Sequence, residues 1–299
     1  MALGTADSYR QAIAKLEVVL KTCEELKDTF RVGSILGLIS ELYGMLGENE
    51  KALAYLQRAI PVVHSTGDRG SEALLMTVSG NIYVQMGQNQ KALKFYRDAL
   101  PIFRAVGDEG AEAKTLNNLG MILSEFGNMN EALDVYQQTL TLAKKVRDSE
   151  TEAGTLLNIG LAYFELSDYQ KALDAYSQSL PILEKLTDKH AYIRLLIAIG
   201  LAQKYIGETT KALDGFNKAL TVARTIEDPV SEASALGNIG TLLNESGDNA
   251  GAIAHYEKAQ RIWNQIKDQK GEARTLVNLG NAYEAIKEFT KARALYDRA

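Results

Sequence analysis

The stretch EGAEAKTLNNLGMILSEFGNMNEALDVYQQTLTLAKKVRD occupies residues 109–148, and the spacing of its small residues is repeated along the chain. Glycine returns with a step of 40 residues, at Gly80, Gly120, Gly160, Gly200, Gly240 and Gly280. Alanine keeps the same step, at Ala12, Ala52, Ala92, Ala132, Ala172, Ala212, Ala252 and Ala292. A fixed period of this length predicts a stack of similar supersecondary units instead of one globular core.

Both elements of each unit are predicted to be helices, because their apolar residues follow the helical period. The first runs from about residue 109 to 126 and carries the apolar positions Leu116, Leu119, Ile122 and Leu123. The second runs from about 130 to 147, where Tyr136 follows Ala132 by four residues. The sequence therefore predicts an all-α solenoid, in which the small residues allow helices to cross closely.

The repeat also sets the boundaries that we expect within a single array over residues 1–299. A half repeat at 8–27 precedes six full repeats and a truncated one, at about 29–67, 69–107, 109–147, 149–187, 189–227, 229–267 and 269–299. Aspartate recurs where its carboxylate would accept the free amide hydrogens of each first helix, at Asp28, Asp68, Asp108, Asp148, Asp188, Asp228 and Asp268. Neither end carries a polar capping element. We therefore expect a piece of a longer protein, and its uncapped ends would allow end-to-end self-association.

Three prolines stand at one repeat position inside the second helix, at Pro61, Pro101 and Pro181. Each removes a helical hydrogen bond and clashes with the carbonyl four residues earlier, which predicts a local bend. The alternative is that the second helix ends at the proline.

These residues together resemble the tetratricopeptide repeat. The resemblance rests on the pair Leu119-Gly120, a large residue at 123, Gly127, Ala132 and Tyr136, and it covers essentially the whole chain. The 40-residue step is longer than the usual 34 and is similar to the branch found in kinesin light chains, in the spindle-orientation adaptor that binds Gα subunits and in many bacterial arrays. The resemblance implies a right-handed superhelix of about seven two-helix repeats plus a half repeat. It also implies that the first helices line a concave, peptide-binding groove.

Composition narrows the classes of partner. The 299 residues are 46% hydrophobic and 24% charged with a formal net charge of −5, so no basic field is present to attract nucleic acid or a lipid surface. The N-terminus has no signal-peptide pattern, and no apolar run is long enough for a membrane span. Cys23 lies on an apolar stripe and is expected to be a core thiol. We expect a cytoplasmic protein.

Sequence motifs give little support to catalysis. His64, His190 and His255 lie in different repeats, and no zinc-protease, Cys-x-x-Cys, Gly-x-Ser-x-Gly or phosphate-loop motif is present. A catalytic or metal site would need several groups converging in a pocket. We therefore predict no enzyme activity, no cofactor and no metal.

Binding residues are expected where the repeats differ along the inward stripe that the resemblance implies. The sixth position of the unit carries carboxamides that can hydrogen-bond the backbone of an extended peptide, at Asn118, Asn158, Asn238 and Asn278. Large apolar residues gather in repeats four and five, at Leu157, Leu161, Phe164, Ile197, Leu201 and Tyr205. Cations that would receive an acidic ligand occupy the second position, at Lys114, Arg194 and Arg274. The alternatives stay open that the carboxamides and cations only face water and that the apolar residues pack between helices.

The sequence favours a non-catalytic scaffold that binds a peptide or protein segment in its groove. The alternative is the regulatory or sensor arm of a larger signalling enzyme, such as a caspase-like protease or a kinase, whose catalytic domain lies outside this segment. A peptide-pheromone receptor that controls transcription is weaker, because no helix-turn-helix region precedes the array.

Overall fold

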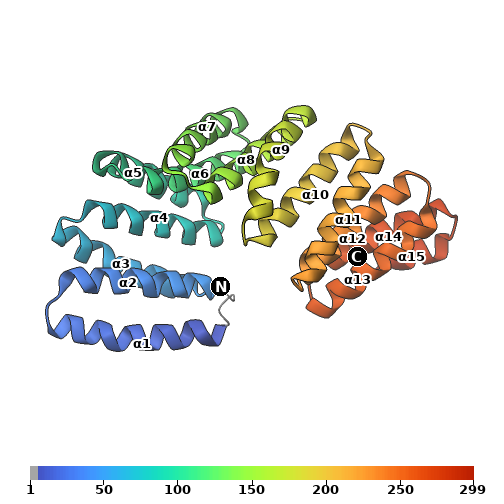
Figure 1. Cartoon of the computed structure of the whole chain (residues 1–299). Coiled ribbons are helices and arrows are strands. Elements are labelled where there is room, and N and C mark those ends of the chain that lie inside the picture. Colours follow the sequence, from blue (N-terminus) through green and yellow to red (C-terminus); the bar gives the residue numbers. More distant parts are fainter. Residues whose placement is uncertain (1–5) are drawn as a thin grey trace. The chain divides into compact units, whose positions relative to one another are not determined.

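A computed structural model describes residues 6–299, which form fifteen α-helices and no strand (Figure 1). The all-α prediction is confirmed. The chain divides into two compact units, Met1–Glu152 and Ala153–Ala299, here called the first and second unit. The helices of the first unit are α1 (Ala6–Glu25), α2 (Thr29–Met45), α3 (Asn49–Thr66), α4 (Arg69–Gln85), α5 (Asn89–Val106), α6 (Glu109–Glu125) and α7 (Met129–Val146). Helix α8 (Ser149–Glu165) leads into the second unit, which continues with α9 (Tyr169–Lys185), α10 (Lys189–Tyr205), α11 (Thr209–Thr225), α12 (Pro229–Glu245), α13 (Asn249–Ile266), α14 (Gln269–Ala285) and α15 (Phe289–Tyr296).

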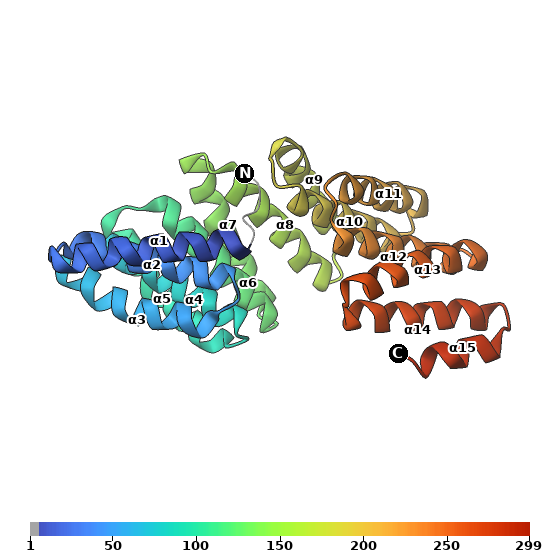
Figure 2. The same ribbon diagram turned by 90° about the horizontal axis from the view of Figure 1, so that it is seen from below.

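Consecutive helices pack as pairs inside each unit. In the first unit α2 packs on α3, α4 on α5 and α6 on α7; in the second, α10 packs on α11, α12 on α13 and α14 on α15. Neighbouring repeats are joined within each unit by contacts between their first helices, which are present for α2 with α4, α4 with α6, α10 with α12 and α12 with α14. Figure 2 shows α12, α13, α14 and α15 following one another in this order. This is the α-solenoid arrangement, in which every repeat is stabilised by its neighbours.

The glycine row marks the closest approach between the two helices of a repeat. The aromatic residue that follows each glycine by sixteen positions lies directly over it, as Tyr256 does over Gly240 and Phe216 over Gly200. A Cβ on any of these glycines would overlap the ring. The rings are buried except in the last repeat, where Tyr296 is 37% exposed. The 40-residue rhythm therefore records a steric requirement of the packing, as the sequence predicted.

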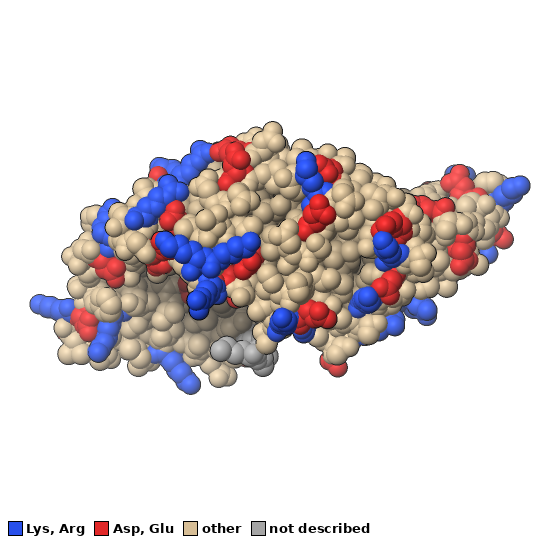
Figure 3. All heavy atoms as spheres, turned by 45° about the horizontal axis from the view of Figure 1, so that its top comes forward, with Lys and Arg blue, Asp and Glu red and all other residues tan. Residues whose placement is uncertain are grey.

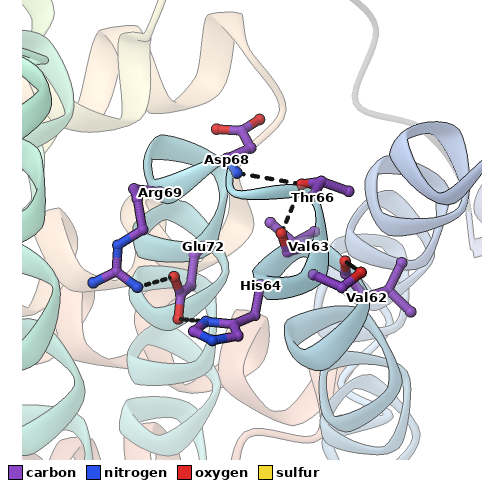
Figure 4. Close-up of polar contacts among 8 residues, drawn as sticks. Val62, Val63, His64, Thr66, Asp68, Arg69 and Glu72 are labelled. Carbon is purple, nitrogen blue, oxygen red and sulfur yellow. Dashed lines mark hydrogen bonds and ion pairs between the residues drawn. The ribbon is translucent and has the colours of Figure 1, made fainter.

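The predicted aspartate caps are present at all seven first helices. Each carboxylate accepts a hydrogen bond from a backbone amide in the first turn, for example Asp108 from Ala111 at 2.9 Å and Asp148 from Thr151 at 3.0 Å. Figure 4 shows the junction before α4, where Thr66 Oγ1 accepts from the Asp68 amide at 3.3 Å. These bonds satisfy amide groups that the helix itself leaves free, and so they fix where each first helix begins.

Helices α3, α5 and α9 run through Pro61, Pro101 and Pro181. The alternative that the second helix ends at the proline is therefore wrong. Apolar residues beyond the prolines keep these helices packed, since Val63, Phe103 and Leu183 are all buried. The local bend stays a prediction.

Cys23 is buried in the core of the first unit together with Ile13 and Leu20. Its interpretation as a core thiol is confirmed.

Candidate binding pocket

The second unit carries a pocket of about 480 Å³ on the side of its first helices. Side chains from α8, α10, α12 and α14 line it, with Tyr176 of α9 and Trp263 of α13 contributed by the second helices. A volume of this size lies within the usual range of ligand-binding pockets. Eight residues that the sequence predicted for binding meet here: Leu161, Phe164, Arg194, Ile197, Leu201, Asn238, Arg274 and Asn278.

Helices α8 and α10 provide an apolar wall. Leu161 is 43% exposed, and Phe164, Ile197 and Leu201 are each partly exposed. Apolar side chains are left open to solvent on both helices, so this wall is a surface that a ligand can cover.

An aromatic cluster extends the wall beyond the pocket. The ring of Phe164 meets Tyr205 edge-on at 5.4 Å between ring centroids, and Tyr205 stacks on Tyr169 at 4.8 Å. Tyr205 is 56% exposed, so the predicted residue lies beside the pocket without lining it. The sequence analysis missed Tyr169. Within the full repeats an aromatic residue there is a signal, since the equivalent positions carry Asn49, Asn89, Met129, Thr209 and Asn249, but the incomplete repeats at the two ends also have one, Tyr9 and Phe289.

Leu157 has a different environment from the other five predicted apolar residues. It is 3% exposed and belongs to the core cluster that contains Tyr176 and Leu195. Leu157 does not line the pocket and is therefore not part of the proposed surface.

The predicted carboxamides do not all occupy the same environment. Asn158, Asn238 and Asn278 are all partly exposed. Asn238 and Asn278 line the pocket, and Asn158 does not. Asn118 lies in the first unit, where its Nδ2 donates to Asn81 Oδ1 at 3.0 Å. Two asparagines of the predicted row are thus brought to the pocket.

Two of the predicted cations lie at the pocket, and both are exposed. Within residues 6–299 neither Arg194 nor Arg274 forms a salt bridge with a carboxylate of the chain, and Glu165 is the acidic residue among the lining side chains. Lys114 lies in the first unit instead, with its Nζ 3.6 Å from the carboxylate of Asp148. The guanidinium groups at the pocket are therefore available to an acidic group of a ligand.

Tyr176 is a lining residue that the sequence analysis did not identify. Its ring is fully buried, and its hydroxyl has no hydrogen-bond partner among residues 6–299. Burial, followed by the negative charge of Glu165, raises the pKa of this phenol. The hydroxyl therefore keeps its proton at neutral pH and is a neutral donor.

A smaller hollow of about 290 Å³ lies in the first unit between α2 and α4. Phe30, Leu38 and Leu74 are 63%, 49% and 47% exposed around it, and burial raises the pKa of Glu41 at its edge. Leu38 stands at the same repeat position as Asn118, and it was not among the predicted binding residues.

The histidines are held in separate structural contacts. His64 Nδ1 lies 3.0 Å from Oε1 of the buried Glu72, a contact drawn as a dashed line in Figure 4. His190 Nδ1 lies 2.9 Å from Asp228 Oδ2. His255 Nδ1 contacts the carbonyl oxygen of Gly251 in its own helix, 2.8 Å away. Across residues 6–299 no three His, Cys, Asp or Glu side chains come together in a way that would hold a metal ion.

Charges of both signs alternate over the face shown in Figure 3. In the part of the chain from residue 6 onward, no helix combines the length and the apolar character that crossing a bilayer requires.

The comparisons with known proteins agree with this architecture. A tetratricopeptide repeat model matches residues 71–145, 151–225 and 231–299, and the chain belongs to this family. No curated protein sequence matches the chain.

Several solved structures share the fold. BtubC from P. vanneervenii is 21% identical, with a TM-score of 0.66 over 74% of this chain and 93% of its own. The quorum sensor NprR from B. thuringiensis is 18% identical, with a TM-score of 0.72 over 96% of this chain and 82% of its own. A signal transduction ATPase with a tetratricopeptide repeat sensor, from Pyrococcus horikoshii, is 16% identical, with a TM-score of 0.76 over 99% of this chain and 47% of its own. At these identities the likeness concerns the fold alone.

Proposed function

We propose that this chain is a non-catalytic scaffold that binds a segment of another protein in the pocket of its second unit. The observation that carries the proposal is the composition of that pocket. A partly exposed apolar wall on α8 and α10 faces carboxamides and unpaired guanidinium groups on α10, α12 and α14. Such a combination of apolar contacts with a few polar groups is typical of sites that orient a ligand.

The ligand that fits is a peptide segment with a large apolar side chain next to a carboxylate. The apolar side chain would cover Leu161, Ile197 and Leu201, and burying one such side chain contributes about 1.5–3 kcal/mol. The carboxylate would pair with Arg194 or Arg274. Asn238 and Asn278 would bond the peptide backbone, each adding about 0.5–1.5 kcal/mol.

A peptide display library screened against the whole chain, followed by calorimetric titration of the selected peptides, tests this proposal. Leu161→Asp should weaken binding by about tenfold to a hundredfold, because it removes an apolar contact and adds a negative charge to the wall. Leu166→Asp is the matched control, since Leu166 is similarly exposed, at 47%, but does not line the pocket. If both variants bind with wild-type affinity, the assigned surface is wrong.

A further inference from the structure

Outside the fourth repeat, each tyrosine that packs on a glycine of the row forms a hydrogen bond, through its hydroxyl, with the first helix of its own repeat. Three of these hydroxyls donate to an oxygen fifteen residues earlier: Tyr96 to Asn81 at 2.6 Å, Tyr256 to Thr241 at 3.1 Å and Tyr296 to Asn281 at 2.7 Å. A fourth meets a hydroxyl twelve residues earlier, Tyr136 with Ser124 at 3.4 Å. The first helix thus supplies a neutral oxygen to each of these phenols.

The fourth repeat departs from this rule. Leu161 and Phe164 stand fifteen and twelve residues before Tyr176, so neither position offers an oxygen. The fifth repeat also has leucine there, Leu201, but it carries Phe216 in place of the tyrosine and has no hydroxyl to satisfy. Repeat four therefore retains a fully buried hydroxyl that its own helices leave without a partner.

The pocket determines which group can reach this hydroxyl. Tyr176, Leu161 and Phe164 all line it, so an arriving side chain must be apolar along its length. The tip of the ligand side chain must accept a hydrogen bond from Tyr176, as the first-helix oxygens of the other repeats do from their tyrosines. This requirement excludes leucine and phenylalanine, which have no acceptor, and tryptophan, whose indole only donates. A carboxylate tip is disfavoured because it would be desolvated close to Glu165. A phenol meets all these conditions, since its oxygen accepts and donates at the end of an apolar ring.

We infer that the pocket recognises a tyrosine side chain of the bound segment, whose phenol oxygen accepts a hydrogen bond from Tyr176. This inference rests on the proposed function and adds the identity of the anchoring residue. The hydroxyl pair reproduces the contact between Tyr256 and Thr241 within the chain. Arg194 lies seven residues before Leu201 on α10, roughly 10 Å along the helix axis. The guanidinium groups therefore hold a carboxylate at the other end of the pocket from the phenol.

The test compares N-acetyl-tyrosine with N-acetyl-phenylalanine, which both carry a carboxylate and differ by one hydroxyl. Their affinities for the whole chain are measured by methyl NMR titration at millimolar concentrations. The wild-type chain should prefer the tyrosine compound by about threefold to tenfold, the range of one net hydrogen bond. Tyr176→Phe should abolish this preference and leave the affinity for the phenylalanine compound unchanged. Tyr256→Phe is the control and should keep the preference, because its hydroxyl already bonds to Thr241.

Because the preference is a ratio measured within one protein, a change in stability does not mimic it. Equal affinities in the wild type, a preference that survives Tyr176→Phe, or no saturable binding of either compound would overturn the inference. Selected peptides that bind at Leu161 without a tyrosine would leave the proposed function standing and refute the inference alone.

Discussion

Two glycines of α12 lie three residues apart in opposite environments, so alanine substitutions at them should change stability in opposite directions. Gly237 has no atom within 4 Å of the position that a Cβ would occupy, whereas a Cβ at Gly240 would lie 2.7 Å from Cε1 of Tyr256. Gly237→Ala therefore changes little except helix propensity. We expect it to raise the free energy of unfolding by about 0.8–1 kcal/mol.

At Gly240 an alanine brings the same gain in helix propensity, but its Cβ would overlap the Tyr256 ring. Carbon atoms are in optimal contact at about 3.5–4.0 Å, so the Tyr256 ring must move by roughly 1 Å. The ring is 2% exposed, and its hydroxyl is bonded to Thr241. Overpacking costs about 1–3 kcal/mol, and the weakened hydroxyl bond adds about 1 kcal/mol. After subtraction of the helix gain, Gly240→Ala should lower the free energy of unfolding by about 1–3 kcal/mol.

Urea unfolding followed by far-UV circular dichroism measures both variants against the wild type. The comparison requires that the free energy of unfolding falls with urea concentration at the same slope in all variants. A repeat array can unfold in stages, and a changed slope would indicate this. Gly160→Leu places a larger side chain against the Tyr176 ring and should cost at least as much as Gly240→Ala. A stabilising Gly240→Ala, or shifts of the same sign for both alanine variants, would refute the packing that we describe.

Three further predictions concern single polar groups. Tyr256→Phe should lower the free energy of unfolding by about 0.5–1.5 kcal/mol, because its hydroxyl bonds to Thr241. Tyr176→Phe should leave this free energy unchanged or raise it, because the lost hydroxyl has no partner. Urea unfolding that gives the same decrease in the free energy of unfolding for both variants would contradict this prediction. Asp268→Ala removes the 2.9 Å bond from the Gly271 amide and should cost about 1 kcal/mol, measured by thermal unfolding. Asp68 accepts hydrogen bonds from the hydroxyl and the amide of Ser71, and these bonds lower its pKa. They therefore stabilise the fold fully at pH values above the unfolded-state pKa, which is near 4. This stabilisation is lost as the pH falls through the lower folded-state pKa. Asp68→Asn should therefore flatten the acid-side fall of the melting temperature, and an unchanged slope would contradict that assignment.

The helices could be predicted closely because one steric rule repeats. The step of glycine and alanine placed the first helix of repeat three at 109–126 and the second at 130–147, and the structure has Glu109–Glu125 and Met129–Val146. The aspartate caps were predictable for the same reason, since a cap depends on residues within one turn of the chain. Local chemistry of this kind is present in the sequence itself.

The site was predictable only in part, because exposure depends on neighbouring helices. Leu157 and Leu161 both belong to the inward stripe, yet one is 3% and the other 43% exposed. Asn118 has a carboxamide partner in Asn81, 37 residues away, that the inward-stripe pattern does not reveal. The unpartnered hydroxyl of Tyr176 could have been found in the sequence, by comparing the residue fifteen positions before each tyrosine.

Methyl NMR of the whole chain, labelled at isoleucine and leucine, tests the central claim most directly when a selected peptide is titrated in. Binding in the second unit's pocket predicts that the resonances of Leu161, Ile197 and Leu201 shift together and saturate. Ile286, which is 44% exposed and does not line the pocket, should stay unchanged. Shifts confined to Ile286 or to methyl groups of the first unit would contradict the account.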